Sequence, residues 1–158
     1  MGKAYSKPEA HVEQPACSEW TATGGSMTPF VLAGSRLQVE RVPISEVRKG
    51  DVVCYIGEDG ASIAHRVTRK VREGTGFVLR TRGDAQRVEE QVPGEAVMSV
   101  VRRVEHRLFS YDTDGPIGRA IARIALGEDR KARAAKIFCA TGWRAIAFAR
   151  RVFVGRFR

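Results

Sequence analysis

The feature that most constrains the fold is a series of short apolar segments between residues 36 and 104. RLQVERV has apolar side chains at alternate positions, which is the period of a half-buried strand. Four further segments follow at roughly ten-residue spacing: VVCYIG, IAHRVTRKV, FVLRTRGD and VPGEAVMSVVRRVEHRLF. Turn sequences such as EDGAS and EGTG separate them, and no helical pattern lies between them. These patterns predict about five or six strands in a small antiparallel sheet or partly closed barrel.

The chain changes character after YDTDGP. Residues 116–126 and 130–154 are rich in Ala, Arg and Ile at helical spacing. Residues 115–158 contain eleven Lys and Arg against two acidic residues, so they carry the whole formal net charge of +9. We therefore expect a mainly β protein with a basic, helical C-terminal appendage. Its predicted parts are an irregular lead-in over 1–20, a β domain over 21–110 and the tail over 115–158.

The second half of the tail has a two-sided pattern on a helical wheel. A narrow basic stripe contains Arg133, Arg144, Arg151 and Arg158, and the remaining arc contains Ile137, Phe138, Trp143, Ile146, Phe148, Val152 and Phe153. A wide apolar face beside a narrow basic one is typical of a helix that lies in a membrane interface. Packing of the same helix against the β domain, or against a second copy, explains the pattern equally well. The sequence leaves the oligomeric state open.

Composition limits the expected compartment and cofactors. The N-terminal segment lacks the apolar core of a secretory signal peptide, and no run of about 18 apolar residues is present. Three cysteines at wide spacing form neither a disulfide framework nor a zinc pattern. We expect a cytoplasmic or peripheral-membrane protein with no cofactor and no metal, in which Cys54 is a small buried residue.

Three places in the β region offer side chains for nucleophilic chemistry. Ser26 lies in TATGGSMTPF, where glycine and proline can hold a hydroxyl out of a sheet. His65 lies in the strand segment IAHRV, and a histidine base can activate a serine. Asp84 or Glu90 could supply the carboxylate that fixes the histidine tautomer. Each of these residues, taken singly, can be explained as an ordinary part of a turn or strand. The interpretation as a nucleophilic site therefore depends on their occurring together.

In combination they resemble the signal peptidase family. The blocks GGSMTPFVLAGSRL, VRKGDVVCY, IAHRV and FVLRTRGD follow one another in the family's order over residues 24–103. They look closest to the branch found in archaea and the endoplasmic reticulum, whose base is histidine. The bacterial leader peptidases and the related self-cleaving repressors have lysine there. The resemblance implies the β fold of these proteins and a serine endopeptidase that cleaves a leader or signal-type peptide at small residues.

The resemblance also assigns roles to individual residues. Ser26 matches the nucleophile, and His65 matches the general base. Asp84 matches the aspartate that follows glycine in the acid loop, whereas Glu90 matches a second acid that is usually aspartate. Family position favours Glu90, expected in a loop, as the partner of His65. It favours Asp84 as a support that bonds N–H groups of its turn, and the two acids remain competing assignments.

The surroundings of the nucleophile follow from the same resemblance. Members often have a small hydroxyl two residues before the nucleophile, and glycine occupies that position here, so the oxyanion hole would use backbone N–H groups. Met27 and Phe30 would form an exposed apolar strip at a shallow groove beside Ser26. Substrate and oxyanion contacts are therefore expected from Gly24, Gly25, Met27 and Pro29.

Two other function classes remain open. An inactive relative would bind peptides without cleaving them, and the net charge of +9 suits a nucleic-acid binder. Nucleic acid is the less expected partner, because the β region has no recognition motif and no aromatic stacking platform. We expect a peptide or protein substrate, and the pattern of residues 130–158 leaves open contact with a membrane surface or packing against protein. For His65 with an ordinary pKa of about 6.5, activity should rise through roughly pH 6–7.

Overall fold

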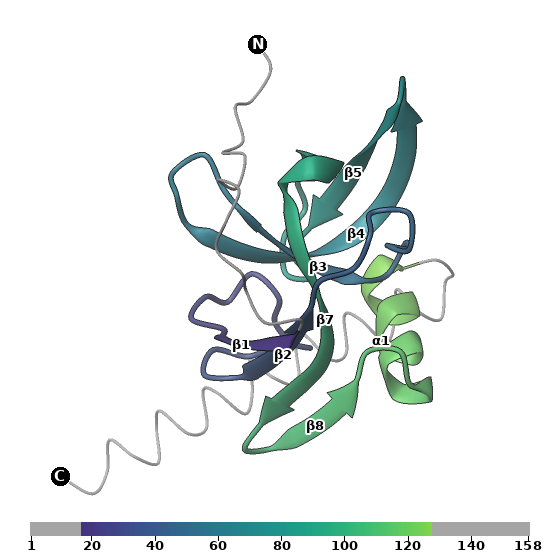
Figure 1. Ribbon diagram of the computed structural model, residues 1–158. Helices are drawn as coiled ribbons and strands as arrows, with labels where there is room; N and C mark the ends of the chain where they lie inside the picture. The colour runs from purple at the N-terminus through teal and green to yellow at the C-terminus, as the bar shows by residue number, and fades with distance from the viewer. Residues whose placement is uncertain (1–16, 128–158) are drawn as a thin grey trace, which may run out of the picture.

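The computed structural model describes residues 17–127, which form an antiparallel sheet with one α-helix beside it (Figure 1). The elements are β1 (Cys17–Thr21), β2 (Arg36–Glu40), β3 (Val52–Ile56), β4 (Ser62–Glu73), β5 (Gly76–Arg82), β6 (Glu90–Pro93), the 3-10 helix η1 (Gly94–Ala96), β7 (Val97–His106), β8 (Phe109–Asp112) and α1 (Pro116–Leu126). The strand order is β1-β2-β7-β3-β4-β5-β6, and β8 pairs with β7. The predicted mainly β fold, a curved antiparallel sheet followed by a helix, is confirmed.

Strand β7 organises the sheet because it pairs along both edges. Val100 is opposite Glu40 of β2 on one edge and opposite Val53 of β3 on the other. Further along the second edge, β7 pairs with β8. Register shifts in β2 and β3 opposite β7 interrupt the ladders. Such bulges bend a strand and increase its twist, which allows one sheet to curve around its side chains.

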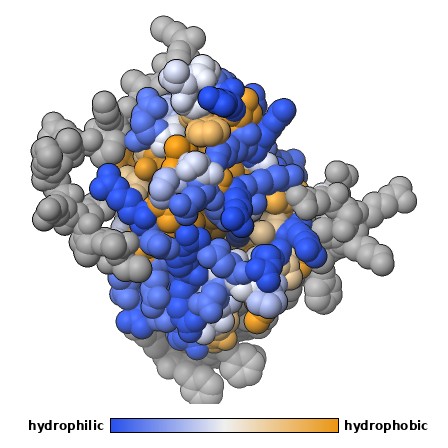
Figure 2. Space-filling model, turned by 45° about the vertical axis from the view of Figure 1, so that its right-hand side comes forward, coloured by the Kyte–Doolittle hydropathy of each residue, from blue (hydrophilic) through white to orange (hydrophobic). Residues whose placement is uncertain are grey.

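The sheet separates two hydrophobic cores. Successive residues of β3 point to opposite faces, so Val52 and Cys54 enter the first core, whereas Val53 and Tyr55 enter the second. Since β3 is covered on both faces, its sequence VVCYI is continuously apolar instead of alternating. The first core also contains Met27, Val31, Leu37, Val39, Val101, Val104 and Tyr111, and the second contains Val47, Val67, Leu79, Val92, Ala96 and Val100. The face that Figure 2 shows is largely hydrophilic, with smaller apolar areas between the polar residues.

The structure contains three short strands that the sequence patterns do not predict. Strand β1 begins at Cys17, inside the segment expected to be irregular, and its Trp20 packs on the first core. Strands β6 and β8 have four residues each. A period of two is not distinctive over four or five residues, so these strands depend on pairing with β2, β5 and β7.

Helix α1 confirms the helical pattern predicted for residues 116–126. Pro116 lies in its first turn, and Gly127 ends it with a left-handed φ of 64°. The helix packs beside β8 and over Gly50, where an added Cβ would lie 3.3 Å from Ala122 Cβ. Glycine at this position therefore lets the helix approach the turn before β3.

Within residues 17–127, no helix is both long and apolar enough to cross a bilayer. The segment 130–158, for which the sequence predicts an amphipathic helix, lies outside the described residues. Its contact with lipid or with a protein stays a prediction.

Candidate active site

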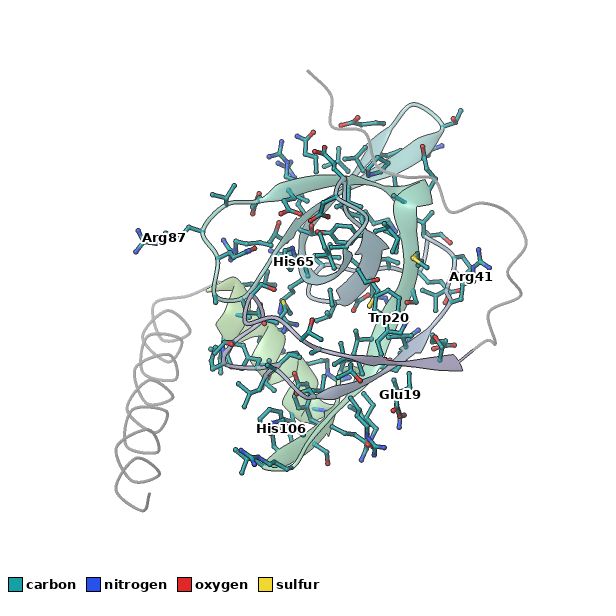
Figure 3. The ribbon with its side chains drawn as sticks, turned by 90° about the vertical axis from the view of Figure 1, so that its left-hand side faces the viewer. Glu19, Trp20, Arg41, His65, Arg87 and His106 are labelled. Atoms are coloured by element: carbon teal, nitrogen blue, oxygen red, sulfur yellow. The ribbon has the colours of Figure 1, made fainter. Side chains whose placement is uncertain are left out.

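His65 lies on β4 with its ring buried. The residue is 4% exposed, and Figure 3 shows it in the interior, whereas His106 lies at the periphery. It is opposite Val53 in the ladder with β3, so its side chain shares the face of the second core. Burial lowers the pKa of His65 below 6.5, and the negative charges of Glu90 and Asp84 oppose this shift only in part. The ordinary pKa expected from the sequence is corrected downward, and the imidazole is neutral at neutral pH.

Polar side chains from three neighbouring strands meet on the same face as this ring. The Tyr55 hydroxyl on β3 lies 3.2 Å from His65 Nδ1 and 3.2 Å from Thr81 Oγ1. It donates a hydrogen bond of 2.8 Å to Glu90 Oε2. The same carboxylate oxygen lies 3.8 Å from His65 Nδ1, which is close enough for charge attraction and too long for a hydrogen bond.

Strand register explains why these side chains meet. Thr81 of β5 is opposite Glu90 of β6 and also opposite Val67 of β4, which lies two residues beyond His65. Side chains directly opposite each other, and those two positions apart on one strand, share a face. The Glu90 carboxylate is therefore directed by a strand and not by the loop expected from the sequence.

Sequence reasoning did not identify Tyr55 or Thr81 as site residues. Both are fully buried, and both fall at inward positions of strands that flank β4. A buried hydroxyl usually needs a polar partner. The available signal was a tyrosine hydroxyl at an inward position of the apolar strand beside the histidine strand.

Asp84 has a different partner. Its carboxylate accepts hydrogen bonds from Arg66 Nε at 2.9 Å and from Arg66 Nη2 at 2.8 Å. The side chains of Arg66 and Asp84 are 5% and 2% exposed, and Arg66 Nη1 also donates to Gly50 O at 2.8 Å. Within residues 17–127 the carboxylate is bonded by this guanidinium and by no N–H of its own turn, so the expectation that Asp84 bonds N–H groups of that turn is corrected. A buried guanidinium next to the turn accounts for the difference.

Ser26 is half-buried in a turn that rests on the segment after β5. Its carbonyl oxygen accepts the N–H of Ala85 at 2.8 Å. An added Cβ on Gly83 would lie only 2.6 Å from that oxygen, so this close approach requires glycine. Since Asp84 lies between these two residues and pairs with Arg66, the segment connects the Ser26 turn to β4.

Two polar groups near the expected reaction centre, one on Ser26 and one on His65, have no hydrogen-bond partner among the described residues. Within residues 17–127, the Ser26 N–H donates no hydrogen bond, and His65 Nε2 forms none. No hydrogen bond joins the Ser26 and His65 side chains among the same residues, and their pairing stays a prediction.

The turn around Ser26 buries residues that the sequence predicts to be exposed. Met27 is 4% exposed and packs in the first core, and Phe30 is 8% exposed. The expected apolar strip at the surface is therefore wrong, because the Phe30 N–H bonds to Met27 O and the turn closes inward. Pro29 is buried as well, whereas Gly24 and Gly25 are exposed. An added Cβ on Gly24 would meet no atom within 4 Å.

Cys54 does not compete with Ser26 as a nucleophile. It is 0% exposed, as predicted, and burial raises the pKa of its thiol from 9.0 to about 12. The thiolate is the reactive form of cysteine, so this residue stays unreactive at neutral pH.

Comparison with known proteins indicates a distant signal-peptidase-like relationship. A stretch of 70 residues, 44% of this chain, is 27% identical to signal peptidase I W of Bacillus subtilis (strain 168). The aligned stretch spans 37% of the length of that relative. No protein-family model matches the chain, and no solved structure matches it. The similarity supports a peptidase-like function at this general level.

Replacement of Asp84 by asparagine should destabilise the fold. Removing one partner of a buried ion pair leaves the other charge uncompensated, which costs about 3–5 kcal/mol. We expect the free energy of unfolding of Asp84→Asn, measured by urea denaturation, to be lower than that of the wild type by about this amount. Asp112→Asn is the control, because Asp112 pairs with Arg103 at the surface and should change stability little. Equal losses in the two variants would contradict the structural role of Asp84.

Proposed function

We propose that this protein is a serine endopeptidase of the signal-peptidase type, with Ser26 as nucleophile and His65 as general base. The observation that carries the proposal is the polar network around His65. A neutral, buried imidazole has one nitrogen beside a tyrosine hydroxyl that bonds a carboxylate, while its other nitrogen has no hydrogen-bond partner within residues 17–127. A general base that activates serine needs this combination.

In the proposed reaction, His65 Nε2 accepts the proton of Ser26 Oγ while that oxygen bonds to the scissile carbonyl carbon. The C–N bond then breaks, and the proton passes from Nε2 to the leaving amine. A water molecule, deprotonated by the same nitrogen, hydrolyses the acyl ester and restores the serine. The Ser26 N–H, which has no hydrogen-bond acceptor within residues 17–127, would donate to the developing oxyanion.

The two acids have separate roles in this proposal. Glu90 would stabilise the imidazolium, since its carboxylate lies 3.8 Å from His65 Nδ1. Asp84 would hold the Ser26 turn in place through Arg66 on one side and the Ala85 N–H on the other. Family position supports the same division of roles.

The proposed substrate is a leader or signal-type peptide with small residues beside the scissile bond, bound in a groove at Ser26. Histidine at position 65 within the HRV block supports the archaeal and endoplasmic-reticulum branch over the branch with a lysine base. Approach to a membrane through residues 130–158 is part of the proposal. The competing candidate is a peptide-binding relative without activity. Two features suit it: glycine stands at position 24 in place of a hydroxyl residue, and no hydrogen bond joins Ser26 and His65 among the described residues.

Labelling with a serine-directed acylating probe tests the nucleophile. We expect a mass-spectrometric adduct on Ser26 in the wild type, and its loss in both Ser26→Ala and His65→Ala. The controls are Ser62→Ala, which changes an exposed serine of β4, and His106→Ala at the periphery, and both should label as the wild type does. Absence of a Ser26-dependent adduct at every value from about pH 6 to 9 would favour the inactive peptide-binding module.

The pH dependence of labelling tests the state of His65. Activity requires neutral imidazole, so it is present above the pKa of the folded protein and lost as the pH falls through it. Because burial lowers this pKa, we expect the midpoint of the acid limb below 6.5. The rate of Ser26 acylation, measured from about pH 4 to 8, gives the midpoint. A midpoint above 6.5 would contradict the assignment.

Substitution of Gly24 tests the oxyanion position. The space beside Gly24 is open, so Gly24→Ser should fold normally and place a hydroxyl where relatives have one. One such donor is worth about 10²–10³ in rate, and we expect an increase in acylation rate that approaches the lower value. Gly24→Ala adds the carbon without the hydroxyl and should leave the rate unchanged. An equal increase in both variants would point to a backbone effect instead.

A further inference from the structure

We propose that Tyr55 is a positioning residue of the active site. Its hydroxyl bridges Glu90 to His65 and thereby selects the His65 tautomer that carries hydrogen on Nδ1. That tautomer leaves Nε2, which forms no hydrogen bond within residues 17–127, as the basic nitrogen. The catalytic meaning of the bridge rests on the proposed function, whereas the bridge and the tautomer are properties of the folded protein without substrate.

The hydrogen-bond inventory of the hydroxyl leads to this tautomer. A phenol has one hydrogen to donate and can accept through its oxygen lone pairs. The Tyr55 hydroxyl donates that hydrogen to the Glu90 carboxylate at 2.8 Å, a shorter distance than those to His65 Nδ1 and Thr81 Oγ1. Toward His65 Nδ1 at 3.2 Å, the oxygen can then act only as an acceptor. Nδ1 must therefore carry a hydrogen, and neutral imidazole carries only one, so Nε2 has the lone pair.

The bridge takes the place of a direct carboxylate–imidazole hydrogen bond. Glu90 Oε2 is 3.8 Å from Nδ1, beyond the length of a hydrogen bond, and the tyrosine oxygen lies within reach of both groups. When Nε2 takes a proton, the positive ring strengthens the bond from Nδ1–H to the phenol oxygen. Glu90 polarises that oxygen through the hydrogen it accepts, and no proton has to leave Tyr55.

Packing holds the bridge in one place. Tyr55 is 0% exposed within the second core, and its ring meets the His65 ring edge-on, with centroids 6.2 Å apart and planes at 72°. Thr81 Oγ1 provides another polar contact to the hydroxyl at 3.2 Å. A tyrosine enclosed in this way cannot swing its hydroxyl away from the imidazole.

The charges that act on His65 come from two directions. Glu90 acts from β6, and Asp84 acts from the segment after β5, where Arg66 neutralises it. Tyr55 contributes a dipole from β3, and Thr81 contributes one from β5. Removal of the tyrosine hydroxyl therefore takes away the group that transmits the Glu90 charge to Nδ1 and leaves the other charges in place.

Nitrogen NMR of the folded protein without substrate tests the bridge. We expect hydrogen on Nδ1 of neutral His65 in the wild type. In Tyr55→Phe, which keeps the ring and removes only the hydroxyl, we expect loss of this tautomer preference and a lower His65 pKa. Glu90→Gln should also lower the pKa. Tyr111→Phe is the matched control, because the hydroxyl of this other buried tyrosine donates to Phe30 O, and it should leave the His65 tautomer unchanged.

Kinetics then separate the bridge from the proposed function. If Ser26 acylates, Tyr55→Phe should reduce the acylation rate by about 10- to 100-fold, as expected for a lost hydrogen bond to a charged group, and should shift the acid limb to lower pH. A wild-type His65 with hydrogen on Nε2, or a Tyr55→Phe variant with an unchanged tautomer and titration, would overturn the bridge even in an active enzyme. The expected NMR changes in a protein that never acylates would support the bridge and reject the peptidase.

Discussion

The buried ion pair between Arg66 and Asp84 is the contact on which the arrangement of the candidate site depends. Two charges removed from water are stable only when each satisfies the other, and their bidentate geometry achieves this. The pair connects β4 to the segment after β5, and Arg66 also bonds Gly50 O in the turn before β3. Because the Ala85 N–H bonds Ser26 O, the turn that carries the proposed nucleophile is attached to the same unit.

Because successive side chains of a β-strand point to opposite faces, β4 contributes to the candidate site from both of its faces. His65 and Arg66 are consecutive, so one side chain joins the second core and the other turns to the opposite face. The imidazole meets hydroxyls and a carboxylate, whereas the guanidinium meets the acid that supports the Ser26 turn. A one-residue slip of β4 would exchange these positions, so the register of the sheet is a condition for the site.

Much of the fold and part of the site could be predicted from the sequence. Alternation and turn residues identified strands β2 to β5 and β7, and helical spacing identified α1. The short strands β1, β6 and β8 were missed because too few residues reveal a period. The exposure expected for Met27 and Phe30 was wrong, since a local apolar motif does not reveal which way its turn closes. Tyr55 was overlooked because it lies in an apolar run typical of core residues.

The sequence by itself determined the chemical inventory: a serine in a glycine-rich turn, a histidine on a strand and two candidate acids in the segment that follows. It also determined the strand pattern, because alternation of apolar side chains is a local property of the chain. Only the tertiary structure decided which acid faces which base. Glu90 approaches His65 through Tyr55, and Asp84 approaches Arg66. These pairings arise from the register between strands distant in sequence and from the burial of charge, and neither can be computed from local spacing.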